Sequence, residues 1–140
     1  MKRKLKVILL IDDDEATNYI HKRVIKETNC AETIVIKENG IEALDYLTSA
    51  VNGKFPQPDL IFLDINMPAM DGWEFLESYK KLNDDQLAKT VIVMLTTSLN
   101  PDDKDKASTI PIITDFIPKP LDPEMVEQIC NNYFESDKEL

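Results

Sequence analysis

The sequence predicts a doubly wound α/β fold, a (βα)5 domain in which a five-stranded parallel sheet carries helices on both faces. Short apolar runs alternate with helical patterns five times along the 140 residues, which is the order of βαβ units. The run 60–63 is apolar at every position, as in a strand that is buried on both faces. Three of the runs stop abruptly at acidic or hydroxyl side chains. Because the carboxyl ends of parallel strands line the edge where such folds bind ligands, these stops also predict where a site lies.

The first strand covers residues 7–11 and breaks at Asp12-Asp13-Asp14, the last of which can cap the helix that follows. The helical spacing of apolar residues predicts which face of this helix packs on the sheet. The residues of that face are Ala16, Tyr19, Ile20 and Val24. His21 lies on the same helix beside Lys22 and Arg23, so we expect it at the surface or facing a partner.

The second strand is the short run 34–36, and Asn39-Gly40 begins the second helix. Asn39 and Glu42 have the spacing of a capping box. The apolar residues of this helix are Ile41, Leu44, Leu47 and Val51. The segment 52–58 is too rich in glycine and proline to continue the helix, so we expect a loop.

The third strand is the run 59–63, and Asp71-Gly72 begins the third helix after a short connection. The residues expected to point inward from this helix are Phe75, Leu76, Tyr79 and Leu82. The fourth strand covers residues 90–95 and ends at Thr96.

Asn100 followed by Pro101 predicts a helix cap with a proline at the first helical position. This fourth helix carries few apolar residues, mainly Ala107 and Ile110, and should be short and weakly anchored. Residues 116–117 form a short fifth strand.

The last helix begins at Asp122-Pro123. The apolar residues on one side of it are Leu121, Met125, Ile129 and Tyr133. Residues 135–140 are expected to be a frayed tail. The sequence shows no internal repeat, no low-complexity segment and no linker to a second domain.

Composition narrows the classes of function. The 26 acidic residues outnumber the 16 basic ones and give a net charge of −10, which disfavours nucleic acid or an anionic membrane as a partner. The apolar run at residues 5–11 is too short for a signal peptide or a membrane span. Cys30 and Cys130 lack the spacing of metal ligands, and reduced thiols are expected. We therefore expect a cytoplasmic protein.

The carboxylates of Asp12, Asp13 and Asp64 should meet at one edge of the sheet. Like charges packed together raise one another's pKa, and a hard cation such as Mg²⁺ relieves the repulsion. Mg²⁺ takes one or two carboxylates and leaves positions for water and phosphate oxygens. An aspartate can also be a nucleophile that forms an acyl phosphate. Thr96 and Lys119 follow the fourth and fifth strands, where a hydroxyl and an ammonium can bind phosphoryl oxygens.

Each of these residues also has an ordinary structural interpretation. Aspartates after a strand are often only turn or cap residues, which is the interpretation we favour for Asp14. A threonine after a strand is usually structural, and Lys119 between two prolines could lie at a plain surface. The occurrence of all four elements at successive strand ends of one short domain favours a site.

Four segments of the sequence together resemble a known family. They are 11–14, 59–72, 94–97 and 116–120. The most specific stretch is Asp64-Ile65-Asn66-Met67-Pro68-Ala69-Met70-Asp71-Gly72. The chain resembles, from about residue 4 to residue 134, the receiver domain of bacterial two-component response regulators of the stand-alone, CheY-like kind. The resemblance implies a flavodoxin-like sheet with the strand order 2-1-3-4-5.

The resemblance implies a phosphoacceptor and a metal site. Asp64 would be the phosphoacceptor. Asp12 and Asp13 would be the acidic pair, with Asp13 a direct ligand of Mg²⁺ and Asp12 acting partly through water. The backbone carbonyl of Asn66 would be a further ligand. Mn²⁺ is an alternative ion for the same ligands, and no other cofactor is expected.

The resemblance also implies a switch. Thr96 would be the hydroxyl that moves to bind the phosphoryl group, with the small Thr97 beside it. Phe116 would be the aromatic residue that turns inward in response. Lys119 would pair with another phosphoryl oxygen, aimed by a Lys119–Pro120 peptide bond that is expected to be cis.

The implied protein is a single-domain response regulator with a receiver domain at 4–134 and no output domain. A sensor histidine kinase or phosphotransfer protein would donate the phosphoryl group, and the protein would catalyse only its own phosphorylation and dephosphorylation. The face made by the fourth helix, the fifth strand and the fifth helix would then bind an unidentified protein or pass phosphate onward. The same face would make any weak dimer of an otherwise monomeric protein.

Three rival interpretations come from other classes. A phosphatase with an aspartyl nucleophile at Asp12 needs Thr or Val at position 16, where this chain has Ala16. A flavodoxin-like FMN carrier needs donors after the first strand, and the three aspartates at 12–14 would repel its phosphate. An interaction module that works without phosphorylation would not require the complete set of site residues.

Overall fold

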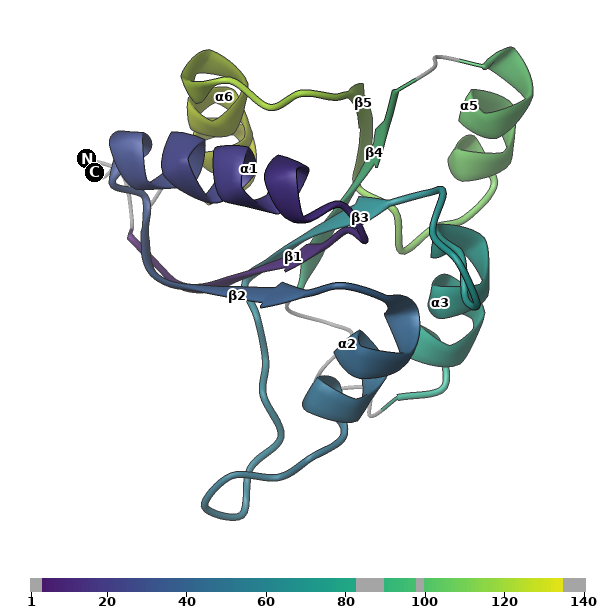
Figure 1. Ribbon diagram of the computed structural model, residues 1–140, viewed down its shortest axis with the longest axis horizontal. Helices are drawn as coiled ribbons and strands as arrows, with labels where there is room; N and C mark the ends of the chain where they lie inside the picture. The colour runs from purple at the N-terminus through teal and green to yellow at the C-terminus, as the bar shows by residue number, and fades with distance from the viewer. Residues whose placement is uncertain (1–3, 83–89, 98–99, 135–140) are drawn as a thin grey trace.

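Five parallel strands form one sheet in the computed structural model, which describes residues 4–82, 90–97 and 100–134 (Figure 1). The strands are β1 (Leu5–Ile11), β2 (Ala31–Lys37), β3 (Leu60–Asp64), β4 (Val91–Thr96) and β5 (Asp115–Pro118). Their order in the sheet is β2-β1-β3-β4-β5, so the predicted fold class and strand order are confirmed. The tail 135–140, for which the sequence predicted a frayed end, lies outside the described residues.

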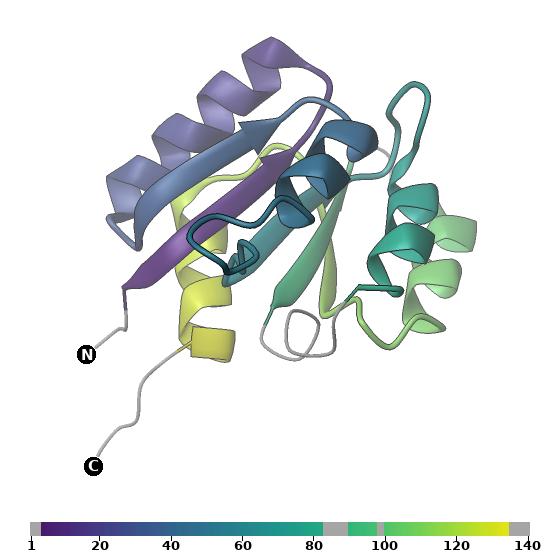
Figure 2. The same cartoon turned by 90° about the horizontal axis from the view of Figure 1, so that it is seen from below.

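Helices cover both faces of the sheet. The described helices are α1 (Glu15–Thr28), α2 (Gly40–Leu47), α3 (Gly72–Tyr79), α5 (Pro101–Ser108) and α6 (Pro123–Phe134). Figures 1 and 2 show α1 and α6 together on one face and α2, α3 and α5 on the other. No helix in the described part of the chain is long and apolar enough to cross a membrane.

The alternation of side chains along each strand divides the core between these two faces. On β1, Ile8 and Leu10 pack with the apolar residues of α1 and α6. Leu9 and Ile11 of the same strand pack with those of α2 and α3. The central strands are therefore apolar on both faces, as the run 60–63 predicted.

Side-chain caps fix where α2, α3 and α5 begin. The carboxamide oxygen of Asn39 accepts the Glu42 N–H at 2.7 Å, although Glu42 itself reaches the N–H of Glu38 and does not complete a capping box. Asp71 and Glu74 do form the reciprocal capping box at the start of α3. The predicted helix starts at Asn39 and Asp71 are confirmed, as is the cap at Asn100, whose side-chain oxygen accepts the Asp102 N–H at 2.9 Å.

The buried face of α1 differs from the prediction. Its buried residues are Asn18, His21 and Ile25. Tyr19 is 66% exposed and Ile20 is 50% exposed, so apolar residues that were expected in the core face solvent. The surface position expected for His21 is wrong, because this side chain is 1% exposed. Polar residues occupy the inner face because each has a hydrogen-bonding partner there.

Smaller corrections apply to other helices. The Ile41 residue is 55% exposed. Val51 lies beyond the end of α2 and is 63% exposed. Ile110 follows the end of α5, which buries only Ala107. Tyr133 on α6 is 38% exposed. The residues that α6 buries are Val126, Ile129, Cys130 and Phe134. The inward residues of α3 were predicted correctly, except that Leu82 follows the end of the helix and is half-buried.

Candidate functional site

The carboxyl ends of the strands bring the predicted site residues together. Asp12 directly follows β1, Asp64 is the last residue of β3 and Thr96 is the last residue of β4. Lys119 directly follows β5, whose register pairs Pro118 with Thr96. Four segments that are distant in the sequence therefore supply one edge of the sheet, as a parallel topology requires.

An ion-pair network lies at the centre of this edge. The Lys119 Nζ atom lies 2.8 Å from Asp12 Oδ2 and 3.1 Å from Asp64 Oδ1. The Lys119 side chain is 11% exposed, and those of Asp12 and Asp64 are 4% and 5% exposed. Burial acts to lower the pKa of Lys119, but the hydrogen bonds and charges of both carboxylates outweigh it and raise that pKa. Lys119 therefore stays protonated and positively charged at neutral pH.

Asp12 is held at every oxygen atom. Its Oδ1 accepts the backbone N–H of Asp14 at 2.9 Å, and its Oδ2 accepts a hydrogen bond from Lys119. Its backbone carbonyl accepts a hydrogen bond from the side-chain Nδ2 of Asn18 at 2.8 Å. Asp14 occupies the N-cap position of α1, as predicted, and its carboxylate accepts the hydroxyl of Thr17. The orientation of Asp12 is thus fixed before any ligand arrives.

Asp64 is buried beside a second carboxylate, and this raises its pKa. Burial raises the pKa of Asp64 to about 6, and the negative charge of Asp12 acts in the same direction. The Lys119 ammonium and the backbone N–H of Asn66 offset part of this effect. At neutral pH the Asp64 carboxylate is still mostly ionised and can act as a nucleophile.

Three carboxylates at this edge fit a divalent cation. Carboxylate oxygens of Asp12, Asp13 and Asp64 lie within 4.8 Å of one another. The neighbouring Lys119 supplies one positive charge against these three negative ones. Asp13 is exposed, so the cluster is open to solvent on its side. Such an all-oxygen set suits Mg²⁺ or Mn²⁺. The ligand role expected for the Asn66 carbonyl stays a prediction.

The two residues expected to switch lie on the strands that lead to this cluster, Thr96 on β4 and Phe116 on β5. Thr96 is 1% exposed, and its backbone carbonyl accepts the N–H of Lys119 at 2.7 Å. Phe116 on β5 is half-buried and packs against the core on the side of α2 and α3. The Lys119–Pro120 peptide bond is cis, as expected. The switching roles themselves stay predictions.

Comparison with known proteins identifies the family. The model of the response regulator receiver domain matches residues 8–131. This chain belongs to the response regulator receiver family. Receivers are phosphorylation-based signalling domains that interact with histidine kinases or phosphotransfer proteins.

Curated relatives and solved structures agree with this assignment. The response regulator Rcp1 of Synechocystis sp. is 37% identical over 101 residues, covering 70% of this chain and 66% of its own. A probable methanogenesis regulatory protein, FilR2, of Methanothrix harundinacea is 32% identical over 101 residues, covering 72% of this chain and 64% of its own. The receiver thus spans just under two thirds of the length of these two relatives.

Two solved structures are similar over nearly their whole length. A two-component response regulator from Cytophaga hutchinsonii has a TM-score of 0.81 at 31% identity, covering 94% of this chain and 98% of that one. The Mn²⁺-bound form of response regulator Rcp1 has a TM-score of 0.72 at 30% identity, covering 95% of this chain and 97% of that one. A divalent ion in a relative fits the acidic cluster of this receiver.

Gly72 allows α3 of the receiver to begin against the end of β3. Its backbone N–H donates to the carbonyl of Ile65 at 2.8 Å. A Cβ atom at this position would lie 2.7 Å from the carbonyl oxygen of Asp64 and 3.0 Å from the Cα atom of Ile65. Both obstacles are backbone atoms, which cannot move aside without shifting the strand end that carries Asp64. Glycine is therefore required by close approach.

Sequence reasoning missed two polar residues behind the site, Asn18 and His21. They are 3% and 1% exposed and lie one turn apart on the inner face of α1. The spacing of Asn18, His21 and Ile25 is that of one helical face, and this was the signal available. The apolar Tyr19 and Ile20 on the opposite face obscured it.

Proposed function

We propose that Asp64 accepts a phosphoryl group from the phosphohistidine of a sensor kinase or phosphotransfer protein. A carboxylate oxygen of Asp64 forms the new O–P bond, the P–N bond breaks, and the imidazole nitrogen leaves with the electron pair. The observation that carries this proposal is the buried Lys119 ammonium placed between Asp64 and Asp12. It provides a fixed positive charge where the phosphoryl oxygens would arrive.

The raised pKa of Asp64 favours it as the acceptor. Hydrogen bonding does not distinguish the two aspartates, because Asp12 accepts from Asp14 and Lys119, and Asp64 accepts from Lys119 and Asn66. Burial and the charge of Asp12 raise the pKa of Asp64, and a more basic carboxylate is a better nucleophile. The rival in which Asp12 is the nucleophile of a phosphatase also needs Thr or Val where this chain has Ala16.

The other site residues have roles that follow from their chemistry. Lys119 binds one phosphoryl oxygen through its ammonium, and Thr96 binds another through its hydroxyl. A bound Mg²⁺ or Mn²⁺, held by Asp12, Asp13 and Asp64 with the Asn66 carbonyl, supplies positive charge that offsets the phosphoryl group. Hydrolysis of the acyl phosphate returns Asp64 to its free carboxylate, so the chain acts only on its own phosphorylation state.

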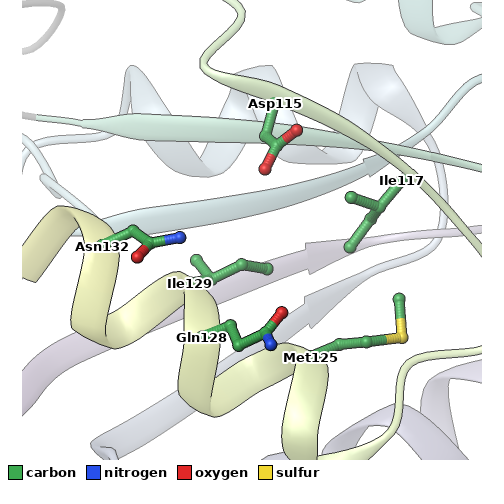
Figure 3. Close-up of a pocket in the computed structure, with 6 residues that line it drawn as sticks. All are labelled: Asp115, Ile117, Met125, Gln128, Ile129 and Asn132. Carbon is green, nitrogen blue, oxygen red and sulfur yellow. The ribbon is translucent and has the colours of Figure 1, made fainter.

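The signal leaves the domain through the face formed by α5, β5 and α6. Movement of Thr96 toward the phosphoryl group leaves space for Phe116 to turn inward, and this shifts the population of conformations of that face. Figure 3 shows a pocket on this face between β5 and α6. Its lining residues are Asp115, Ile117, Met125, Gln128, Ile129 and Asn132. We propose that a downstream protein, a second copy or a phosphate relay partner uses this face.

The first experiment is intact mass spectrometry after incubation with phosphoramidate, with and without Mg²⁺. The wild type is expected to gain one phosphoryl group only with Mg²⁺, and hydroxylamine should remove it. Asp64→Asn should gain none, whereas Asp45→Asn, an exposed aspartate on α2, should behave as the wild type. No gain in the wild type would overturn the proposal in favour of an interaction module that works without phosphorylation. A gain that persists in Asp64→Asn would move the acceptor elsewhere.

A further inference from the structure

The inner face of α1 contacts the backbone of two segments that carry site residues. His21 and Asn18 lie on this face, are 1% and 3% exposed, and stand one helical turn apart. Buried polar side chains are costly unless they are hydrogen bonded. His21 bonds to the segment after β5, and Asn18 bonds to the residue after β1. Both hydrogen bonds therefore hold backbone groups close in sequence to the ion pair of Lys119 with Asp12 and Asp64.

The turn that carries Lys119 is held at two points. On one side of Pro120, the backbone N–H of Lys119 donates to the carbonyl of Thr96 at 2.7 Å. On the other side, the backbone N–H of Leu121 donates to Nε2 of His21 at 3.3 Å. Pro120 has no N–H of its own. On the carboxyl side of the turn, the first backbone N–H after Lys119 is therefore that of Leu121, and its hydrogen-bond acceptor is His21 of α1.

Asn18, on the same face of α1, contacts Asp12, which is the ion-pair partner of Lys119. Asn18 donates through Nδ2 to the backbone carbonyl of Asp12 at 2.8 Å. Its Oδ1 is, within the part of the chain that the structure describes, the one buried side-chain polar atom without a hydrogen-bonding partner. A buried amide with one unsatisfied end is unfavourable for stability. The hydrogen bond from Asn18 to the Asp12 carbonyl therefore explains why a polar residue occupies this buried position.

We propose that His21 is a positioning residue, which holds the Leu121 end of the turn so that the Lys119 ammonium stays between Asp12 and Asp64. Asn18 supports this geometry from the Asp12 side. The proposal rests on the proposed function, since it assigns His21 a part in the phosphorylation of Asp64.

The proposed role requires a neutral imidazole. An Nε2 atom that accepts a hydrogen bond carries a lone pair, which places the ring proton on Nδ1. Burial lowers the pKa of His21. The negative charge of Asp12 raises this pKa and the positive charge of Lys119 lowers it, and the net result is a lowered pKa. The imidazole is therefore neutral at pH 7 and available as an acceptor.

The test compares phosphorylation rates at subsaturating phosphoramidate with Mg²⁺. His21→Leu removes the acceptor and is expected to slow the phosphorylation of Asp64 about tenfold. His21→Gln, whose amide oxygen can accept the Leu121 N–H, should recover most of that loss. Ile25→Val is the matched control, because Ile25 is equally buried on the same face of α1 but belongs to the apolar core. It should phosphorylate at the wild-type rate.

A double-mutant cycle separates positioning from general destabilisation. If His21 acts through Lys119, then His21→Leu should cause no further loss of rate in a Lys119→Met background. Binding of Mg²⁺ alone, followed by calorimetry, should be unchanged in His21→Leu, because Lys119 is not a ligand. Should the leucine variant fail to fold, His21→Met, which also lacks a strong acceptor, takes its place.

Each outcome decides between the two proposals. If the wild type gains no phosphoryl group, the proposed function falls and this inference falls with it. If the wild type is phosphorylated but His21→Leu matches Ile25→Val, only the inference is overturned. The inference would also be overturned if His21→Leu lowered the phosphorylation rate by the same factor in the wild type and in Lys119→Met, since the effect of His21 would then not depend on Lys119.

Discussion

Asp64 is the residue whose charge opposes folding, because it is buried beside Asp12 and its pKa is raised to about 6. The folded chain binds the Asp64 proton more tightly than the unfolded chain does, so the contribution of Asp64 to stability rises as the pH falls through 6 toward 4. Above pH 6 the ionised carboxylate costs the fold about 3 kcal/mol. Asp64→Asn removes this cost, while Lys119 keeps Asp12 as its partner.

The expected result is therefore a more stable variant at neutral pH. In EDTA at pH 7, Asp64→Asn should raise the free energy of unfolding by about 3 kcal/mol, and the gain should disappear below about pH 4. Urea denaturation at a series of pH values measures it. A variant that is less stable than the wild type at pH 7 would show that the ion pair with Lys119 outweighs the burial of the charge.

At the level of elements, the start of α3 and the end of β3 are joined by the close approach of Gly72. A Cβ atom there would meet backbone atoms of Asp64 and Ile65, whereas one at Gly40, at the start of α2, would meet the flexible side chain of Met70. Alanine is the better helix former at both positions. The two glycines therefore differ in what blocks the methyl group and not in helix propensity.

This difference gives a matched pair of variants. Gly72→Ala should lower the free energy of unfolding by about 1 to 2 kcal/mol and slow the phosphorylation of Asp64, because the strand end must shift. Gly40→Ala should stay within about 1 kcal/mol of the wild type, since Met70 can move aside. Denaturation curves and phosphoramidate rates measure both effects. Equal effects of the two variants would contradict the role assigned to the backbone contact.

The elements themselves were predictable, but the buried faces of some helices were not. The helix starts at Asn39, Asp71 and Asn100 depend on local sequence, and each lies where it was predicted. The inner face of α1 depends on partners that are distant in the sequence. His21 is buried because it accepts the N–H of Leu121, a hundred residues away. Apolar spacing alone therefore selected the exposed face.

At the level of the whole molecule, fold and site were predictable for the same reason. A doubly wound parallel sheet puts the carboxyl ends of its strands at one edge, so residues after successive strands must meet there. The predicted meeting of Asp12, Asp64 and Lys119 at this edge is confirmed. The parallel topology does not determine which oxygen of Asp12 bonds to which donor, or that His21 of α1 bonds to the segment after β5. Such details depend on side-chain packing, which has no signal in local sequence.

The charge of the whole cluster leads to the last prediction, which concerns metal and stability. Three carboxylates and one ammonium leave an excess of negative charge that a bound Mg²⁺ offsets only in the folded chain. At a concentration of 100 times the dissociation constant, binding adds about 2.7 kcal/mol to the free energy of unfolding. For a chain of 140 residues this should raise the melting temperature by several degrees over that in EDTA.

Two neighbouring aspartates provide the control for this effect. Asp13→Asn removes an exposed member of the cluster and should abolish most of the Mg²⁺-dependent rise in melting temperature at little cost to the metal-free fold. Asp14→Asn changes an exposed carboxylate that lies outside the cluster and bonds to Thr17, so the rise should remain. Thermal unfolding with EDTA or Mg²⁺ distinguishes the two. A rise that both variants retain would place the stabilising ion elsewhere, because a site built on Asp13 must depend on its carboxylate.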